Sequence, residues 1–272
     1  MTLSSHQNSN STDLGLSANV QWVVVCDAVG TVIHPEPAVA NAYHAHGQRH
    51  GSSLGLAEIK RRFSAGRKNV FGVRLASDIA ASGSRDYLKQ HVQLPSSNRS
   101  EREMWKRLVV EIFDDVDDTD ALFTDLWDHF AEAENWRAFE DVGPCVAALK
   151  KMGVLVVIAS NFDSRLLDFA GQIEGLRDFD HVFCSSEIGF RKPDVRFYDT
   201  VEAYLRAQDQ SRPFRFCMVG DDLEHDCLAP QSLGWDAVCL DRSGKIEPKY
   251  QPLSGLVCLP EWFEARLSAD KK

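Results

Sequence analysis

Long apolar runs are missing from this 272-residue sequence: none reaches the roughly 18 residues that a membrane-spanning helix requires. Residues 1–20, MTLSSHQNSNSTDLGLSANV, lack both the basic start and the apolar segment of a secretory signal peptide. Their high content of Ser and Asn predicts a disordered N-terminal tail. We therefore expect no membrane association.

An excess of positive charge is missing as well. The chain has 30 Lys and Arg against 40 Asp and Glu, a formal net charge of -10, whereas nucleic-acid binding requires clustered basic residues. Paired cysteine motifs are also absent, since the seven cysteines show no CxxC spacing and most lie in or beside apolar runs. We expect no nucleic-acid partner, reduced and buried thiols, and a cytoplasmic protein.

What the sequence does contain is a series of short, continuous apolar runs, which are typical of strands buried on both faces of a parallel sheet. The runs cover residues 22–26, 154–160, 181–185, 216–220 and 237–240, with a weaker sixth at 256–259. Helical patterns lie between them, for example at 194–207 and from Pro144 to Lys151. This alternation predicts an α/β fold with a doubly wound parallel sheet.

The interval between the first two predicted strands is too long for a single crossover connection. It contains two amphipathic patterns, at 104–113 and 122–130, and no convincing strand. We therefore predict an inserted α-helical cap domain at residues 36–137. Residues 21–35 and 138–272 would form the core domain, and residues 1–20 the tail.

Polar side chains follow the predicted strands at their carboxyl ends or in the loops beyond. They are Asp27, Ser160, Asn161, Lys192, Asp221 and Asp222. Because the carboxyl ends of parallel strands lie at one edge of a sheet, these side chains should converge. Carboxylates suit a hard cation such as Mg²⁺, while a lysine and a hydroxyl suit phosphoryl oxygens. The pattern predicts a Mg²⁺-assisted phosphoryl site.

Four segments, DAVGT (27–31), IASN (158–161), GFRKPD (189–194) and VGDDLEHD (219–226), follow one another in the chain. In this order they resemble the four motifs of the haloacid dehalogenase-like (HAD) hydrolase superfamily. The long helical insert resembles the C1 cap of subfamily IA. The resemblance implies a Rossmann-like core under a helical cap, and a hydrolytic activity.

The resemblance also implies roles for individual residues. Asp27 matches the nucleophile, which forms an aspartyl-phosphate intermediate in the family's phosphatases and also binds Mg²⁺. Ser160 and Lys192 match the groups that bind phosphoryl oxygens. Asp221 matches the main acidic Mg²⁺ ligand, with Asp222 as an alternative and Asp226 behind the ligands. Thr31, Asn161 and His34 lie beside these motifs and are further candidates for substrate contact.

Val29 departs from the family pattern. Family phosphatases usually have an Asp there, which protonates the leaving oxygen and then activates water. Valine can do neither, although its backbone carbonyl can still bind Mg²⁺. A general acid/base contributes about 10² to 10⁴-fold, so the change predicts slow or narrow activity. His34 could replace the missing acid, or could simply be polar surface.

The leading prediction is thus a Mg²⁺-dependent phosphohydrolase of a small phosphorylated metabolite, as a monomer or homodimer. One alternative is an impaired module that binds Mg²⁺ and phosphate without turnover. Phosphonate cleavage would need a cap lysine such as Lys60 or Lys68. Haloacid hydrolysis is disfavoured, because the family's dehalogenases place an aromatic residue and an arginine after the nucleophile, and residues 28–40 contain neither Tyr nor Arg.

Three further features of the insert are open to a functional or a structural interpretation. Arg62, Lys68 and Trp105 are candidates for substrate contact. His46 and His50 have the i, i+4 spacing of a metal pair but lack an evident third ligand. The acidic run 114–120 lacks the glycine and closing glutamate of a calcium loop, which favours a solvated linker between helices.

Overall fold

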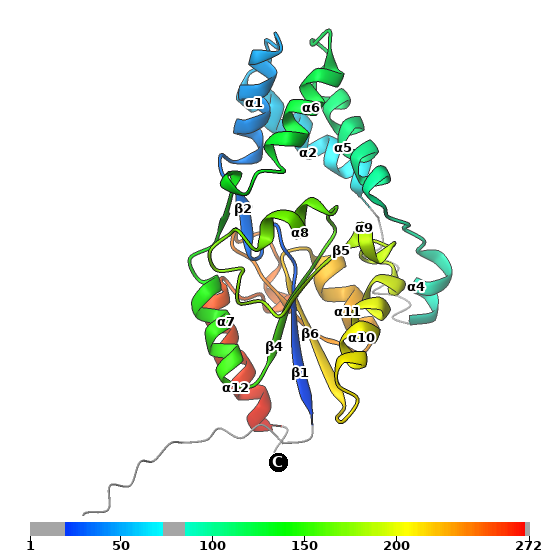
Figure 1. The fold of residues 1–272 in the computed structure, drawn as a ribbon, viewed down its shortest axis with the longest axis vertical. Helices are drawn as coiled ribbons and strands as arrows, with labels where there is room; N and C mark the ends of the chain where they lie inside the picture. The colour runs from blue at the N-terminus through cyan, green and yellow to red at the C-terminus, as the bar shows by residue number, and fades with distance from the viewer. Residues whose placement is uncertain (1–19, 73–84, 270–272) are drawn as a thin grey trace, which may run out of the picture.

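The central sheet has five parallel strands in the order β5-β4-β1-β6-β7 (Figure 1). The structure, a computed structural model, describes residues 20–72 and 85–269. The strands are β1 (Gln21–Cys26), β4 (Leu155–Ser160), β5 (His181–Cys184), β6 (Phe214–Gly220) and β7 (Asp236–Cys239). The predicted α/β fold with a parallel sheet is confirmed. The predicted tail falls outside the described residues, apart from Val20.

Both faces of the sheet are covered by helices, which is why its strands read as continuous apolar runs. Val24 and Cys26 of β1 face a layer formed by α7 (Val142–Lys151), α8 (Arg165–Ala170) and α12 (Leu259–Ala269). Val23 and Val25 face the opposite layer, which contains α10 (Val195–Gln208) and α11 (Ala229–Ser232). All six residues of β1 are buried, so the strand is the centre of the core.

The predicted sixth strand at 256–259 is wrong. Leu256–Cys258 form a short 3₁₀ turn, η4, that leads directly into α12. Leu256, Leu259 and Phe263 are buried against the sheet at helical spacing. A short apolar run is compatible with a strand or with a buried helical segment, and here the periodicity continues into a helix.

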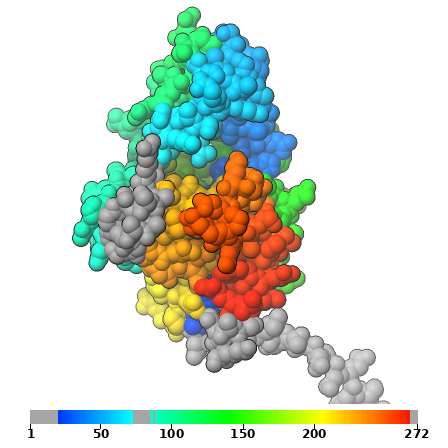
Figure 2. Space-filling view, turned by 180° about the vertical axis from the view of Figure 1, so that it is seen from behind, coloured from blue at the N-terminus to red at the C-terminus, as the bar shows by residue number. Residues whose placement is uncertain are grey.

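A separate helical lobe stands on the carboxyl edge of the sheet (Figures 1 and 2). It consists of α1 (Val39–Arg49), α2 (Leu56–Phe71), α5 (Asn98–Ile112) and α6 (Thr119–His129). These helices bury their own apolar cluster, which includes Tyr43, Ile59, Leu108 and Leu122. Two antiparallel strands, β2 (Ile33–Pro35) and β3 (Trp136–Ala138), connect the lobe to the core.

One segment of the predicted cap range packs on the core instead. Leu88 of α4 (Arg85–His91) and Val92 belong to the apolar cluster around α10. The backbone N–H of Leu94 donates to Asp194, and that of Ser96 donates to the Gly189 carbonyl. Within the predicted range 36–137, residues 85–96 therefore pack with the core, because their apolar side chains complete that face of the sheet.

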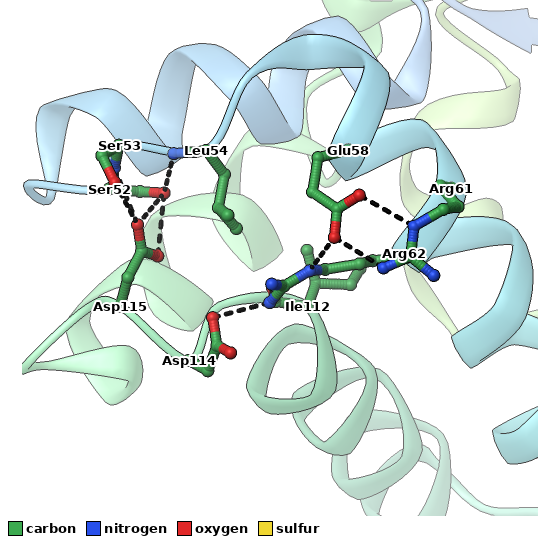
Figure 3. Close-up of polar contacts among 9 residues, drawn as sticks. All are labelled: Ser52, Ser53, Leu54, Glu58, Arg61, Arg62, Ile112, Asp114 and Asp115. Atoms are coloured by element: carbon green, nitrogen blue, oxygen red, sulfur yellow. Dashed lines mark hydrogen bonds and ion pairs between the residues drawn. The ribbon is translucent and has the colours of Figure 1, made fainter.

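Acidic side chains of the 114–120 run make contacts inside the lobe (Figure 3). Asp115 accepts hydrogen bonds from the Ser52 hydroxyl and the Ser53 backbone. Asp114 pairs with Arg62 at 2.6 Å, and Asp118 caps α6. The predicted solvated linker between helices is confirmed, since the run joins α5 to α6 and its acidic residues are exposed, and three of its carboxylates also tie the loop to neighbouring helices.

Short helical turns complete the fold. They are η1 (Ala133–Asn135), α9 (Ser185–Ile188), η2 (Leu223–Leu228, wound as a π-helix) and η3 (Pro248–Tyr250). The fold packs η2 against β7, and a disulfide joins Cys227 of η2 to Cys239 of β7. The expectation that all seven cysteines are reduced thiols is therefore wrong for this pair. Among the described residues, no helix combines the length and apolarity needed to cross a bilayer.

Candidate active site

The predicted polar residues meet at the carboxyl edge of the sheet, below the helical lobe. Asp27 directly follows β1, and its backbone N–H extends the ladder by donating to the Val219 carbonyl at 2.9 Å. Asp221 directly follows the adjacent strand β6, and Lys192 comes from the loop before α10. Parallel pairing of β1 with β6 therefore brings the first and fourth motifs side by side.

A buried lysine links two of the carboxylates. The Nζ atom of Lys192 lies 2.7 Å from an oxygen of Asp27 and 2.7 Å from an oxygen of Asp226. Lys192 is 2% exposed and Asp226 1%. Burial alone would lower the pKa of Lys192, but attraction to Asp226 and Asp27 outweighs it and raises that pKa. The lysine is therefore held in its charged form, as a buried ion between two partners must be.

Asn161 fixes the backbone of this lysine. The Lys192 N–H donates to Asn161 Oδ1 at 2.7 Å, and Asn161 Nδ2 donates to the Lys192 carbonyl at 3.0 Å. Both polar groups of the amide are used in this clamp. Asn161 is therefore a positioning residue for Lys192, and its predicted contact with substrate stays a prediction.

Three carboxylates form the candidate cation site. Asp27, Asp221 and Asp226 each offer an oxygen, and these oxygens all lie within 4.8 Å of one another. We call these three residues the carboxylate group. Within the part of the chain that the structure describes, no other three acidic, histidine or cysteine side chains form such a group. The set consists only of carboxylate oxygens, which suits a hard cation such as Mg²⁺.

The charges in the carboxylate group repel one another. Asp221 is exposed at the rim of the site. Desolvation of its carboxylate by the surrounding protein is the larger cause that raises its pKa from 3.8 to about 6, and repulsion from Asp27 and Asp222 adds to it. Burial raises the pKa of Asp226 as well, against the attraction of Lys192. One lysine thus does not neutralise the group, and a bound divalent cation would favour all three ionised forms.

Asp222 lies outside the carboxylate group. Its Oδ1 accepts hydrogen bonds from the backbone of Glu224 and His225, both at 3.0 Å, and so caps η2. Its own N–H donates to Asp226 at 3.1 Å. The alternative ligand predicted at Asp222 is therefore corrected: Asp226, expected to stand behind the ligands, provides the third oxygen, and Asp222 organises the turn that presents it.

Two glycines that the sequence analysis did not single out make room for these carboxylates. Gly30 has a φ of +90°, and a Cβ there would lie 2.4 Å from an oxygen of Asp221. A Cβ at Gly220 would lie 2.2 Å from an oxygen of Asp226. The available signal was their position inside two of the motifs: Gly30 lies three residues after Asp27, and Gly220 directly precedes Asp221.

The structure separates the remaining candidates. Ser160, the last residue of β4, and half-buried Val29 lie at the same sheet edge as Asp27. Thr31 is fully buried, which corrects its expected contact with substrate. His34 packs on Phe139 and lines a cavity of about 640 Å³ whose lining includes no member of the carboxylate group, which favours the alternative of polar surface over that of the missing acid.

Most of the candidate residues in the lobe contact other residues of the lobe. His50 pairs with Asp125 at 2.7 Å, while His46 packs on His129, so the predicted metal pair does not form. Arg62 is committed to Glu58, Asp114 and the Ile112 carbonyl. Trp105 packs on Phe71, and both Lys60 and Lys68 are exposed on α2.

Comparison with known proteins finds a single family. The sequence matches the haloacid dehalogenase-like hydrolase family over residues 23–234. Haloacid dehalogenase-like hydrolase domain-containing protein 3 from Xenopus laevis is 26% identical over 157 residues, which cover 56% of this chain and 62% of the relative. The same protein from Mus musculus is 31% identical over 145 residues, covering 51% and 56%. The matches thus span less than two thirds of these two relatives. The Danio rerio protein is 25% identical over 82% of this chain and 86% of its own length.

Solved structures share the fold. A defluorinating L-2-haloacid dehalogenase has a TM-score of 0.63 at 18% identity, with 90% of this chain and 95% of that chain covered. The HAD-hydrolase YfnB from Bacillus subtilis, bound to magnesium, has a TM-score of 0.62 at 17% identity, covering 91% and 98%. At such low identity, these likenesses concern the architecture alone.

The raised pKa of Asp221 predicts a pH-dependent stability of the metal-free protein. Between about pH 4 and pH 6 the folded state binds a proton at Asp221 that the unfolded state has lost, so stability falls as the pH rises through this window. Asp221→Asn should remove this contribution. In EDTA, the urea unfolding free energy of the variant minus that of wild type should increase from pH 4 to about pH 6 and then level off. A constant difference across this range would contradict the assignment.

Gly30→Ala tests the steric fit of Asp221, with Gly234→Ala as the matched control. Gly234 has a similar φ of +85° but open space for a Cβ. Both variants should lose about 1–2 kcal/mol for left-handed backbone. Because the clashing atoms of Asp221 are at the end of its side chain, only Gly30→Ala should displace this carboxylate and lose the pH-dependent step above. If Gly30→Ala retained the pH-dependent change in stability, the position of Asp221 would not depend on the absence of a side chain at residue 30.

Proposed function

The chain belongs to the haloacid dehalogenase-like hydrolase family, and from this premise we propose that it is a Mg²⁺-dependent phosphohydrolase of a small phosphorylated metabolite. The observation that carries the proposal is the position of Lys192, shared between Asp27 and Asp226 while Asp221 completes the carboxylate group. A site for a phosphoryl dianion needs fixed positive charge beside the attacking carboxylate, and this arrangement supplies it.

The residues divide the work as follows. Asp27 attacks phosphorus with a carboxylate oxygen, so that an aspartyl phosphate forms while the bond from phosphorus to the leaving oxygen breaks and the leaving group departs as its oxyanion; water then hydrolyses this acyl phosphate to regenerate Asp27 and release phosphate. Lys192 and Ser160 bind the phosphoryl oxygens. Asp27, Asp221 and the Val29 carbonyl would hold Mg²⁺, with Asp226 close enough to join or support them. When bound, the cation neutralises the phosphoryl charge that the carboxylates repel.

Val29 narrows the range of substrates. Position 29, where the family's phosphatases usually have an acid, is a valine, and His34 lines a cavity that includes no member of the carboxylate group. Substrates whose leaving groups depart without protonation, such as acyl and aryl phosphates, should therefore react faster than alkyl phosphates. The alternative of haloacid hydrolysis is supported only by the similarity of the fold to dehalogenases. The aromatic residue and the arginine that the family's dehalogenases place after the nucleophile are missing, since residues 28–40 contain neither Tyr nor Arg.

The proposal is tested by assaying acetyl phosphate and an aryl phosphate with Mg²⁺ and with EDTA. We expect turnover only with Mg²⁺, and loss of turnover to background in Asp27→Asn. Asp86→Asn, an exposed substitution on α4, is the matched control and should retain the wild-type rate. Metal-dependent phosphate binding without turnover would instead identify an impaired binding module. Halide release from 2-chloropropionate without metal would favour haloacid hydrolysis.

Val29→Asp should restore acid/base assistance. The gain should be largest for alkyl phosphates, up to about 10² to 10⁴-fold, and small for aryl phosphates, whose leaving groups need little protonation. Val29→Asn is the matched control: its side chain has nearly the same shape as that of Asp but no acidic group, so it should give no such gain. Rates at saturating Mg²⁺ across leaving groups of graded pKa provide the measurement. An unchanged dependence on leaving group in a folded Val29→Asp protein would show that position 29 is not the place of the missing acid.

A further inference from the structure

The turn η2, which presents Asp226 to the carboxylate group, lacks one of its own backbone donors. The N–H of Ala229 donates to the Glu224 carbonyl, five residues earlier, as in a π-helix. The next donor in this pattern would be the N–H of residue 230, which would serve the His225 carbonyl. Residue 230 is a proline and has no N–H. The π-helical pattern therefore provides no donor for the His225 carbonyl.

A tyrosine from another element supplies this donor. Tyr198 of α10 donates its hydroxyl to the His225 carbonyl at 2.5 Å. Tyr198 is 1% exposed, and its ring packs edge-on against Trp235 with centroids 5.6 Å apart. Burial raises the pKa of Tyr198 well above its usual range, so the hydroxyl keeps its proton and remains a donor. The hydrogen bond joins α10 to η2 across 27 residues of sequence.

The peptide group between His225 and Asp226 is thereby held on both sides. Its carbonyl accepts from Tyr198, and its N–H, which belongs to Asp226, donates to the Asp222 carbonyl at 2.8 Å. Because a peptide group is planar, these two bonds fix its orientation and the direction in which the chain enters Asp226. The Asp226 side chain occupies the space beside Gly220, where a Cβ would lie 2.2 Å from its oxygen. Its position therefore depends closely on the peptide before it.

The same turn of α10 also contacts the partner of Asp226. Lys192 lies just before α10, and its Nζ is 5.9 Å from the centre of the Phe197 ring. Phe197 and Tyr198 are consecutive and buried, so one turn of α10 contacts the lysine and η2 together. Lys192 and Asp226 form their 2.7 Å ion pair between these two contacts. Helix α10, on the same face of the sheet as α11 (Figure 1), thus supports both sides of the pair.

We propose that Tyr198 is a positioning residue for the candidate metal site: by holding the His225 carbonyl it places the Asp226 carboxylate beside Asp27 and Asp221. The inference rests on the proposed function, since it takes the carboxylate group to be the Mg²⁺ site. Tyr198 acts through η2, because its hydroxyl contacts the backbone and not a carboxylate. Residues that orient metal ligands typically contribute about 10- to 100-fold to metal affinity. Since Tyr198 acts on one of three carboxylates, we expect the lower end of this range.

Calorimetric titration of the full chain with Mg²⁺ tests this role without any need for turnover. Tyr198→Phe removes one oxygen and keeps the ring that packs on Trp235, so the fold should persist, which circular dichroism checks. We expect its Kd for Mg²⁺ to rise about tenfold. Val201→Ala is the matched control, because Val201 is buried on the same helix and its truncation lowers stability without removing the bond to His225. This control should keep the wild-type Kd.

Pro230→Ala provides a rescue, because it supplies the N–H that the π-helical pattern lacks. In the double variant Tyr198→Phe/Pro230→Ala, residue 230 can donate to the His225 carbonyl, and Kd should return to within about threefold of wild type. A merely structural role of the Tyr198 ring would predict no such recovery. The double variant also keeps the proposal testable if Tyr198→Phe alone fails to fold.

The possible results separate the two proposals. If wild type binds Mg²⁺ and Tyr198→Phe binds it equally well, or loses affinity that Pro230→Ala does not restore, the positioning role is overturned and the proposed function stands. Wild type that binds no Mg²⁺ would remove the proposed function, and the inference with it.

Discussion

The ion-paired contact of Lys192 with Asp27 and Asp226 is the constraint on which the site depends. Buried carboxylates repel one another and lose their hydration, so they persist at one place only if a charge of opposite sign lies among them. Much of the local structure follows from that need. Asn161 fixes the backbone of the lysine, and Gly220 leaves room for Asp226.

The turn after β6 also follows from this constraint. Asp222 caps η2 and donates its own N–H to Asp226, so the acidic run VGDD is divided between two tasks. Asp221 stands at the rim, where a cation can reach it, and Asp222 supports the turn. Neighbouring residues of identical chemistry thus differ in role because their side chains leave the turn in different directions.

The loop of Lys192 is also where the lobe meets the core. Arg191, the residue before Lys192, contacts Met104 of α5 and Phe71 of α2. A second contact forms where Arg165 lies over the Trp127 ring at 3.4 Å. The lobe therefore contacts the core beyond its β2 and β3 connections, and one of these contacts is a single residue from the phosphoryl-binding lysine.

The sequence by itself determined the parallel sheet, the helical insert and the convergence of Asp27, Lys192 and Asp221. Continuous apolar runs that end in polar residues have few other solutions, because parallel strands must present their carboxyl ends at one edge. Only the tertiary structure decided which atoms touch: Asn161 on the Lys192 backbone, Asp226 in the carboxylate group, and Arg191 on Met104 of the lobe. These contacts depend on side-chain directions and join segments as far apart as the 165 residues between Asp27 and Lys192. Local patterns carry no information about such directions, since helix and strand periodicities define which face a residue takes but not which partner the fold brings to it.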